Sequence, residues 1–395
     1  MRKIIHNGTL ILDGILRIEN GYIVINDGVI EEIGEGPAPA FEDTETIDAC
    51  GKYILPGFID IHIHGAMGKD FIEGTQEAVD AAAMNVVKDG CTSFMASLTV
   101  LSHEEMLNVL DGFSNVTPVK NGAHFLGVHE EGPYLSEKYN ALMDLRYLRD
   151  PSIEEMKEMI AHSGNRIKIM TVAPERKGMR EFISYLSEHR ITVMMGHSDA
   201  KPSDIHNAVE AGAKGFTHLY NAMSQHLHRE PGCVTGAMLE TGTFAELICD
   251  GFHVNTDVVR ATYQMFTPKR LVLITDAMLG KGMPNGDYVF SGLNCYKEGK
   301  HVRVKETGRI AGSAFGMNDA VLFVKKNCQA SMNDIVQMAC VNPSVLAQVS
   351  DTKGTLTVGK DADIVILDEE IQIKHVFVFG NEVYRKSRRG GRTIS

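Results

Sequence analysis

The amino-acid sequence predicts an α/β protein with two parts: a closed (β/α)8 TIM-type barrel, and a small β-sandwich domain built from both chain ends. Between about residue 55 and residue 349, apolar β-type runs alternate with amphipathic segments of helical length, which indicates βα units around a parallel sheet. Eight such runs are present, the strand number of this barrel. Both chain ends instead carry short β-type runs separated by turns.

The composition is that of a globular enzyme-sized chain. The 395 residues are 44% hydrophobic and 23% charged, which excludes disordered and fibrous classes. The net charge of −12 argues against a nucleic-acid partner, because phosphate backbones require a basic face. Apolar runs shorter than a membrane span, and an N-terminus too short for a signal peptide, predict a cytoplasmic protein without a membrane partner. The seven scattered cysteines indicate neither a disulfide framework nor a thiolate metal site.

The predicted small domain covers residues 1–55 and 356–386. In its N-terminal part, expected to be a small antiparallel sheet, β-type runs lie at residues 3–5, 9–12, 22–25 and 29–33, and Asp27-Gly28 between the last two is typical of a hairpin turn. The C-terminal part has such runs at residues 354–356, 362–368 and 375–381. The basic, glycine-rich tail, residues 387–395, is predicted to be disordered.

The barrel is expected over residues 56–355. Its candidate strands are residues 58–62, 92–96, 125–129, 167–172, 192–195, 215–217, 245–248 and 271–274. Chemistry in such barrels is located on the loops that follow the strands. Polar residues just past the strand ends are therefore the candidates for a functional site.

The first barrel strand ends in two histidines, His62 and His64. Residues i and i+2 of a strand share one face and lie roughly 6.6 Å apart along the chain. Two imidazoles in this arrangement can bind one metal ion. Two hydrogen-bonded core histidines are the structural alternative.

Four further polar residues follow other strands: Glu131 the third, His197 the fifth, His218 the sixth and Asp276 the eighth. Together with the histidine pair they form the imidazole and carboxylate set that zinc or ferrous iron takes. Glu130 competes with Glu131, because a shift of one residue in register exchanges inward and outward positions. Asp276 alternatively caps the next turn, but beside a cation an ionised aspartate is suited to act as a base.

Short motifs along nearly the whole chain resemble one known family. They are Pro-Gly-Phe-Ile-Asp (56–60), Glu-Gly-Pro (131–133), Gly-His-Ser (196–198), Thr-His-Leu-Tyr-Asn-Ala-Met (217–223), Arg-Glu-Pro-Gly (229–232), Asp-Gly-Phe-His-Val (250–254), Thr-Asp-Ala (275–277), Ala-Gly-Ser (311–313) and Gly-Lys-Asp-Ala-Asp (359–363). The chain resembles the amidohydrolase superfamily and, within it, the N-acetylglucosamine-6-phosphate deacetylase family. The run 217–223 is the most specific part, whereas 359–363 indicates only the superfamily.

The resemblance implies a metal-dependent hydrolase that removes the acetyl group from an N-acetylhexosamine 6-phosphate. Glu131, His197 and His218 would hold the ion that activates water. His62 and His64 would bind a second ion, so two zinc or iron ions per chain are expected, roughly 3.5 to 4 Å apart. Asp276, the sixth residue of the metal site, would act as general base and then as the acid that protonates the leaving amine.

The substrate side depends on fewer residues. Arg229 and His253 match family positions that bind the sugar phosphate, and the resemblance implies that Arg229 reaches in from a partner subunit, which predicts a homodimer. Asn221 and Ala222 are expected to supply a further donor to the phosphate. The alternatives are a surface salt bridge for Arg229 and a core hydrogen bond for His253.

One departure from the family pattern concerns Met143, which stands where the family has a histidine that contacts the sugar. A thioether cannot exchange hydrogen bonds with a hydroxyl as imidazole does. N-acetylgalactosamine 6-phosphate or another N-acyl amino sugar therefore stays open as substrate. A cyclic-amide hydrolase or deaminase of the same superfamily and a non-catalytic scaffold are further alternatives. The roles of His226 and His228 stay open as well.

Overall fold

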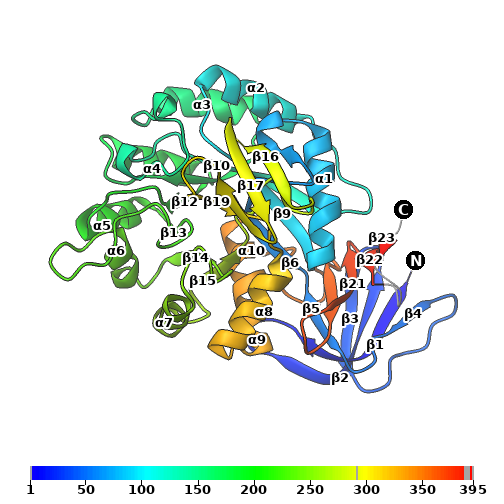
Figure 1. The fold of residues 1–395 in the computed structure, drawn as a ribbon. Coiled ribbons are helices and arrows are strands. Elements are labelled where there is room, and N and C mark those ends of the chain that lie inside the picture. The colour runs from blue at the N-terminus through cyan, green and yellow to red at the C-terminus, as the bar shows by residue number, and fades with distance from the viewer. Residues whose placement is uncertain (1, 291, 387–391, 394–395) are drawn as a thin grey trace.

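The computed structural model describes residues 2–290, 292–386 and 392–393, and it contains the expected barrel (Figure 1). Eight parallel strands form one sheet in the order β15-β14-β13-β12-β11-β10-β9-β6. Their bounds are β6 Phe58–Ile63, β9 Cys91–Leu98, β10 His124–Glu131, β11 Ile167–Val172, β12 Thr192–Met195, β13 Gly215–Phe216, β14 Phe244–Ile248 and β15 Leu271–Ile274. Each coincides with a predicted run, so the fold class is confirmed.

Backbone hydrogen bonds connect the first and last strands of the barrel. The N–H of Asp276 donates to the carbonyl of His62 at 2.9 Å, and the N–H of His64 donates to the carbonyl of Ala277 at 2.7 Å. Ile63 and Ala277 form a parallel bridge. These bonds bring the ends of β6 and β15 together, although the two strands are remote in sequence.

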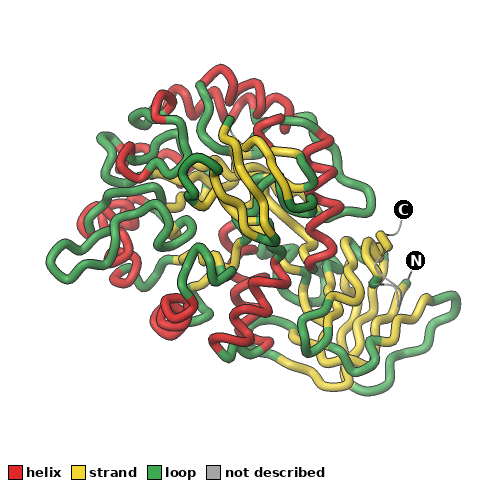
Figure 2. Tube along the Cα trace, viewed as in Figure 1, coloured by secondary structure: helices red, strands yellow, loops and turns green. Residues whose placement is uncertain are grey.

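Helices surround the barrel strands, as Figure 2 shows in red around yellow. Helix α2 illustrates the pattern: Ser102 caps its N-terminus by accepting a hydrogen bond from the N–H of Glu105, and the apolar residues Leu110 and Phe113 are buried. Among the described helices, none combines the length and apolarity that crossing a membrane requires. The helices are α1 Gln76–Val86, α2 His103–Ser114, α3 Ile153–His162, α4 Met179–Glu188, α5 Pro202–Ala211, α6 Cys233–Leu239, α7 Thr256–Phe266, α8 Met317–Cys328, α9 Met332–Val336 and α10 Asn342–Leu346.

The two chain ends build one small β domain, with the blue and red strands side by side in Figure 1. Its described strands are β1 Lys3–Ile11, β2 Arg17–Asn26, β3 Val29–Glu35, β4 Glu45–Asp48, β5 Tyr53–Pro56, β20 Ile364–Leu367, β21 Ile373–Val378, β22 Asn381–Arg385 and β23 Arg392–Thr393. They are hydrogen-bonded into one nine-stranded sheet. Ile5, Ile54 and Ile364 share a single core, so both chain ends are needed to bury it.

Several details of the small domain differ from the sequence prediction. Runs 3–5 and 9–12 are one strand, β1, whose register shifts around Gly8. Strands β4 and β5 pair with β1 in parallel, so the sheet is mixed and not purely antiparallel. Residues 354–356 form a bend followed by a loop residue and not a strand, with Gly354 at φ 85°.

The Asp27-Gly28 hairpin is confirmed, because both residues have the positive φ, 49° and 85°, that the tight turn between β2 and β3 requires. Residues 387–391 and 394–395 of the expected disordered tail lie outside the described residues. The domain limits 1–55, 56–355 and 356–386 stay a prediction.

A four-stranded antiparallel sheet that the sequence patterns did not indicate follows β15. It consists of β16 Gly286–Phe290, β17 Leu293–Glu298, β18 His301–Val304 and β19 Ile310–Ser313. A separate two-stranded sheet, β7 Gly65–Ala66 with β8 Lys69–Asp70, follows β6. Ser313 donates its N–H to the carbonyl of Asp276 at 2.9 Å and its hydroxyl to the carbonyl of Thr275 at 2.6 Å. The sheet is thereby fixed to the residues that follow β15.

Candidate active site

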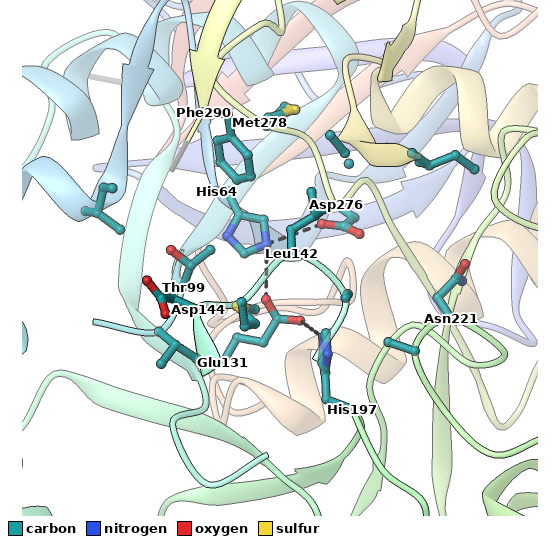
Figure 3. A pocket seen from close by; sticks show the side chains of 18 of the residues that line it. His64, Thr99, Glu131, Leu142, Asp144, His197, Asn221, Asp276, Met278 and Phe290 are labelled. Atoms are coloured by element: carbon teal, nitrogen blue, oxygen red, sulfur yellow. Dashed lines mark hydrogen bonds and ion pairs between the residues drawn. The ribbon is translucent and has the colours of Figure 1, made fainter. Parts of the chain in front are cut away.

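A cavity of about 570 Å³ opens at the carboxyl ends of the barrel strands, where the sequence predicts the chemistry. Figure 3 shows the side chains of His64, Glu131, His197 and Asp276 directed toward one another. The predicted site residues that line it are His64, Glu131, Met143, His197, His218, Asn221, Ala222, His253 and Asp276. His62 is fully buried beside His64, with 3.2 Å between their Nε2 atoms.

Glu131, the last residue of β10, contacts two histidines from neighbouring strand ends. Its Oε1 lies 3.0 Å from Nε2 of His197 and 2.9 Å from Nε2 of His218. The two Nε2 atoms are 3.1 Å apart, and all three side chains are buried. The ligand atoms of this group lie within 4.8 Å of one another, so they can bind one ion. Three nitrogen and oxygen ligands with room for a fourth are typical of a catalytic zinc site.

His62, His64 and Asp276 form a second group of the same compactness. Nε2 of His64 lies 3.3 Å from Oδ1 of Asp276 and 3.4 Å from Oε2 of Glu131. Nε2 of His62 lies 3.6 Å from Oε1 of Glu131. The Glu131 carboxylate therefore adjoins both groups, and a second ion could be held beside the first.

The backbone is unusual at three of these residues. His197, His218 and Asp276 have φ values of 48°, 30° and 48°, in the left-handed region that side chains other than glycine seldom adopt. Each follows the end of a barrel strand. Backbone strain of this kind is concentrated at functional sites, where the surrounding structure holds it in place.

The donor set fits a divalent cation. Imidazole Nε2 atoms face each other at 3.1 and 3.2 Å, and two carboxylates lie among them. The buried Nδ1 atoms of His64 and His218 have no hydrogen-bond partner within the described chain. Converging lone pairs and negative charges are stabilised by a cation, and this ligand mix suits zinc or iron.

Both carboxylates of the site are ionised at neutral pH. Burial by itself raises the pKa of Glu131, but the charge of His62 and the hydrogen bonds from His197 and His218 outweigh it and hold that pKa well below its usual range. Burial likewise opposes ionisation of Asp276, whereas the hydrogen bond from His64 and the charge of His62 lower the pKa to about 2. Asp276 can therefore accept a proton.

Glu130 does not line the cavity. It is fully buried, and neither carboxylate oxygen has a hydrogen-bond partner among the described residues. Burial raises the pKa of Glu130 to about 8. The register of β10 thus places Glu131, and not Glu130, beside the histidines.

Glu246 in β14 is a site residue that the sequence analysis missed. Its Oε2 accepts hydrogen bonds from Nδ1 of His62 at 3.0 Å and from the backbone N–H of His218 at 3.1 Å. The first bond leaves Nε2 of His62 free to face Glu131. The sequence feature that could have predicted this role is the position of Glu246 as a lone carboxylate in an apolar strand, because a buried charge requires a partner.

We expect the Glu246→Gln variant to bind metal about 10- to 100-fold more weakly at the His62 and His64 group. The amide keeps the size of the carboxylate but lacks the charge that strengthens the basicity of His62. Metal titration against a competing chelator measures this effect. Glu130→Gln is the matched control, because it also replaces a buried strand carboxylate, and equal affinities in both variants would contradict the positioning role of Glu246.

Two predicted substrate residues have clear surroundings inside the cavity. Met143 packs with Val100, Leu135 and Leu148 and lines the cavity, so it forms part of an apolar wall there. Nδ1 of His253 bonds Oδ2 of Asp250 at 2.7 Å, which is the hydrogen bond proposed as its alternative role. Since His253 also lines the cavity, both roles are compatible.

Arg229 lies on an exposed segment between Gln225 and Gly232, whose backbone atoms are joined by a 3.0 Å hydrogen bond. It does not line the cavity of its own chain, and it forms no salt bridge with the described residues.

Nδ1 of His226 bonds Oγ1 of Thr235 at 3.0 Å. Neither His226 nor His228 lines the cavity.

Comparison with known proteins gives matches over nearly the whole chain. A model of the amidohydrolase family matches residues 53–383. An N-acetylglucosamine-6-phosphate deacetylase of Bacillus subtilis is 34% identical over 369 residues, which cover 92% of this chain and 93% of that protein. An N-acetylgalactosamine-6-phosphate deacetylase of Escherichia coli O157:H7 is 30% identical over 368 residues, covering 92% and 94%.

The structure resembles solved structures as well. An N-acetyl-D-glucosamine-6-phosphate deacetylase mutant of Mycobacterium smegmatis, in complex with N-acetyl-D-glucosamine-6-phosphate, superposes with a TM-score of 0.88 at 28% identity, covering 97% of this chain and 98% of that chain. A deacetylase of the same name from Thermotoga maritima has a TM-score of 0.85 at 26% identity, covering 97% and 100%.

Proposed function

The chain belongs to the amidohydrolase family, and we propose that it is a metal-dependent hydrolase of N-acetylhexosamine 6-phosphates, with N-acetylglucosamine 6-phosphate as its main substrate. The products are acetate and the amino sugar 6-phosphate. The observation that carries this proposal is the convergence of Glu131, His197 and His218 with Asp276 in one cavity. The names of the Bacillus and Mycobacterium relatives support the substrate class.

The side chains divide the chemistry among them. Glu131, His197 and His218 would hold one zinc or iron ion, and His62 and His64 a second. When bound, such ions polarise the acetyl carbonyl and lower the pKa of water. Asp276 takes a proton from the water that attacks the carbonyl carbon. It then returns this proton to the nitrogen as the carbon–nitrogen bond breaks.

Subunit association and location are part of the proposal. The exposed position of Arg229, outside the cavity of its own chain, supports a homodimer in which it reaches the partner's site. Measurement of the molar mass in solution tests the dimer. All seven cysteines lie in the described chain without a disulfide bond, which suits a cytoplasmic location.

N-acetylgalactosamine 6-phosphate is a second candidate substrate. The apolar wall at Met143 favours it, because a hydrogen bond that would help to distinguish sugar hydroxyls is missing there. The Escherichia coli relative named for that sugar supports the same alternative. A cyclic-amide hydrolase or deaminase is the remaining enzymatic alternative.

A substrate screen tests these proposals. Zinc- or iron-loaded protein is incubated with both N-acetylhexosamine 6-phosphates and with the unphosphorylated sugars, and acetate is quantified. We expect the highest kcat/KM with N-acetylglucosamine 6-phosphate. A higher value with the galactose epimer selects the second candidate. Metal-loaded protein that releases no acetate from any of these sugars contradicts the proposed function.

A further inference from the structure

Arg309 is a cationic residue of the cavity wall that none of the proposed roles uses. Two of the described lining residues are arginine, Arg146 and Arg309, and none is lysine. The guanidinium of Arg146 is engaged by Asp144, with 3.0 Å from Nε to each carboxylate oxygen. The Arg309 side chain has no salt bridge or hydrogen bond with the described residues. Its charge is therefore available to an anionic ligand.

The backbone of Arg309 is hydrogen-bonded within the hairpin of β18 and β19, whereas the residue is exposed to solvent. Its carbonyl accepts a 2.9 Å hydrogen bond from the N–H of Val304, and its N–H donates to Oγ1 of Thr307 at 3.3 Å. Strand β19 begins at the next residue and ends at Ser313, which is bonded to the backbone of Asp276. Arg309 thus precedes a strand whose far end is hydrogen-bonded to the backbone of Asp276, the proposed catalytic residue.

The same sheet contacts the loop that carries His253. Phe252 stacks on His301 of β18, with 4.1 Å between ring centroids and 12° between ring planes. The guanidinium carbon of Arg303 lies 4.5 Å from the centroid of the Phe252 ring, and Arg303 is the register partner of Ile310, next to Arg309. These contacts join the hairpin that carries Arg309 to the loop that carries His253, and both residues line the cavity.

We propose that Arg309 binds the phosphate group of the substrate from within the same chain. This inference rests on the proposed function, which requires an anionic group on the sugar. A guanidinium can donate two parallel hydrogen bonds to phosphate oxygens, and the acidic groups elsewhere in the cavity make a dedicated cation necessary. Arg309 would then add a permanent positive charge from the same chain to the phosphate contacts expected from His253, Asn221 and Ala222.

The test compares phosphorylated and unphosphorylated N-acetylglucosamine in full-length R309A and R309K. We expect R309A to raise KM for the phosphorylated sugar about 10- to 100-fold with little change in kcat. Hydrolysis of the unphosphorylated sugar should stay at the wild-type rate. R309K should have a KM between those of R309A and wild type, because lysine keeps the positive charge but lacks the two parallel N–H donors of the guanidinium. Lys305→Ala is the matched control, since Lys305 lies in the same hairpin, pairs with Asp287 and does not line the cavity.

Two results would overturn the inference while the proposed function stands: unchanged KM in R309A, or equal losses on both sugars. Wild-type protein that is inactive on both sugars and also on N-acetylgalactosamine 6-phosphate and its unphosphorylated form contradicts the proposed function instead. In that case the phosphate-binding role of Arg309 is tested by measuring how far inorganic phosphate raises the thermal unfolding midpoint. This rise must be smaller in R309A than in wild type, and an equal rise overturns the inference.

Discussion

The Asp276→Asn variant is expected to lose kcat for acetate release by about 10²- to 10⁴-fold, the range that general acid–base groups contribute. Asparagine has the shape of aspartate but cannot take up the proton of the attacking water. Asp276 is the carboxylate at the end of β15 that accepts a hydrogen bond from His64 and whose pKa of about 2 keeps it ionised. Steady-state acetate release at saturating substrate measures the loss.

The kcat of Asp276→Asn can be compared with that of the wild type only if the variant keeps its metal. Glu131, His197 and His218 form a complete ligand group without Asp276, so at least one ion should stay bound. Asp257→Asn is a matched control, because Asp257 lies on the first turn of α7, is exposed and does not line the cavity. An Asp276→Asn protein with normal metal content and undiminished kcat would remove Asp276 from the mechanism.

The second large effect concerns stability and not catalysis. We expect Glu130→Gln to gain about 3 kcal/mol in free energy of unfolding relative to wild type as the pH rises from 5 to 8. Glu130 is fully buried without a hydrogen-bond partner among the described residues, and burial raises its pKa from 4.5 to about 8. Its ionisation in the folded state is therefore costly, and glutamine cannot ionise.

The direction of this pH dependence follows from the number of protons that Glu130 binds in the folded and unfolded states. Between pH 4.5 and about pH 8 the folded state keeps the Glu130 proton, whereas the unfolded state releases it. The contribution of Glu130 to the free energy of unfolding of the wild type therefore falls as the pH rises, and it levels off above about pH 8. Urea unfolding of both proteins at several pH values measures the difference. A difference that does not widen with pH would show that Glu130 has an ordinary pKa.

The neighbouring Glu131→Gln variant provides the contrast. Glu131 lies beside His197 and His218 at 3.0 and 2.9 Å, so its loss should remove metal and activity. Glu130→Gln should keep both. The two adjacent glutamates lie on opposite faces of β10, so we expect Glu130 to affect the pH dependence of stability and Glu131 to affect metal binding and catalysis.

Much of the barrel could be predicted from the sequence because strand formation depends on local pattern. The eight apolar runs were found, and the histidine pair at the end of β6 was recognisable from its spacing of two. The sheet of β16 to β19 was missed because its strands are short and partly exposed. The bend at residues 354–356 was mistaken for a strand, since a three-residue run cannot show a period.

The sequence by itself determined where the barrel strands lie, and its motifs indicated the family. The strand pattern left Glu130 and Glu131 open, although the family resemblance implied Glu131. The tertiary structure shows that Glu131 faces the histidines, because a period of two leaves the inward face undefined until neighbouring strands set the register. It also decided that Glu246 supports His62 and that Arg309 lines the cavity. Both relations join residues remote in sequence, so barrel closure and the packing of β19 against the end of β15 were needed to create them.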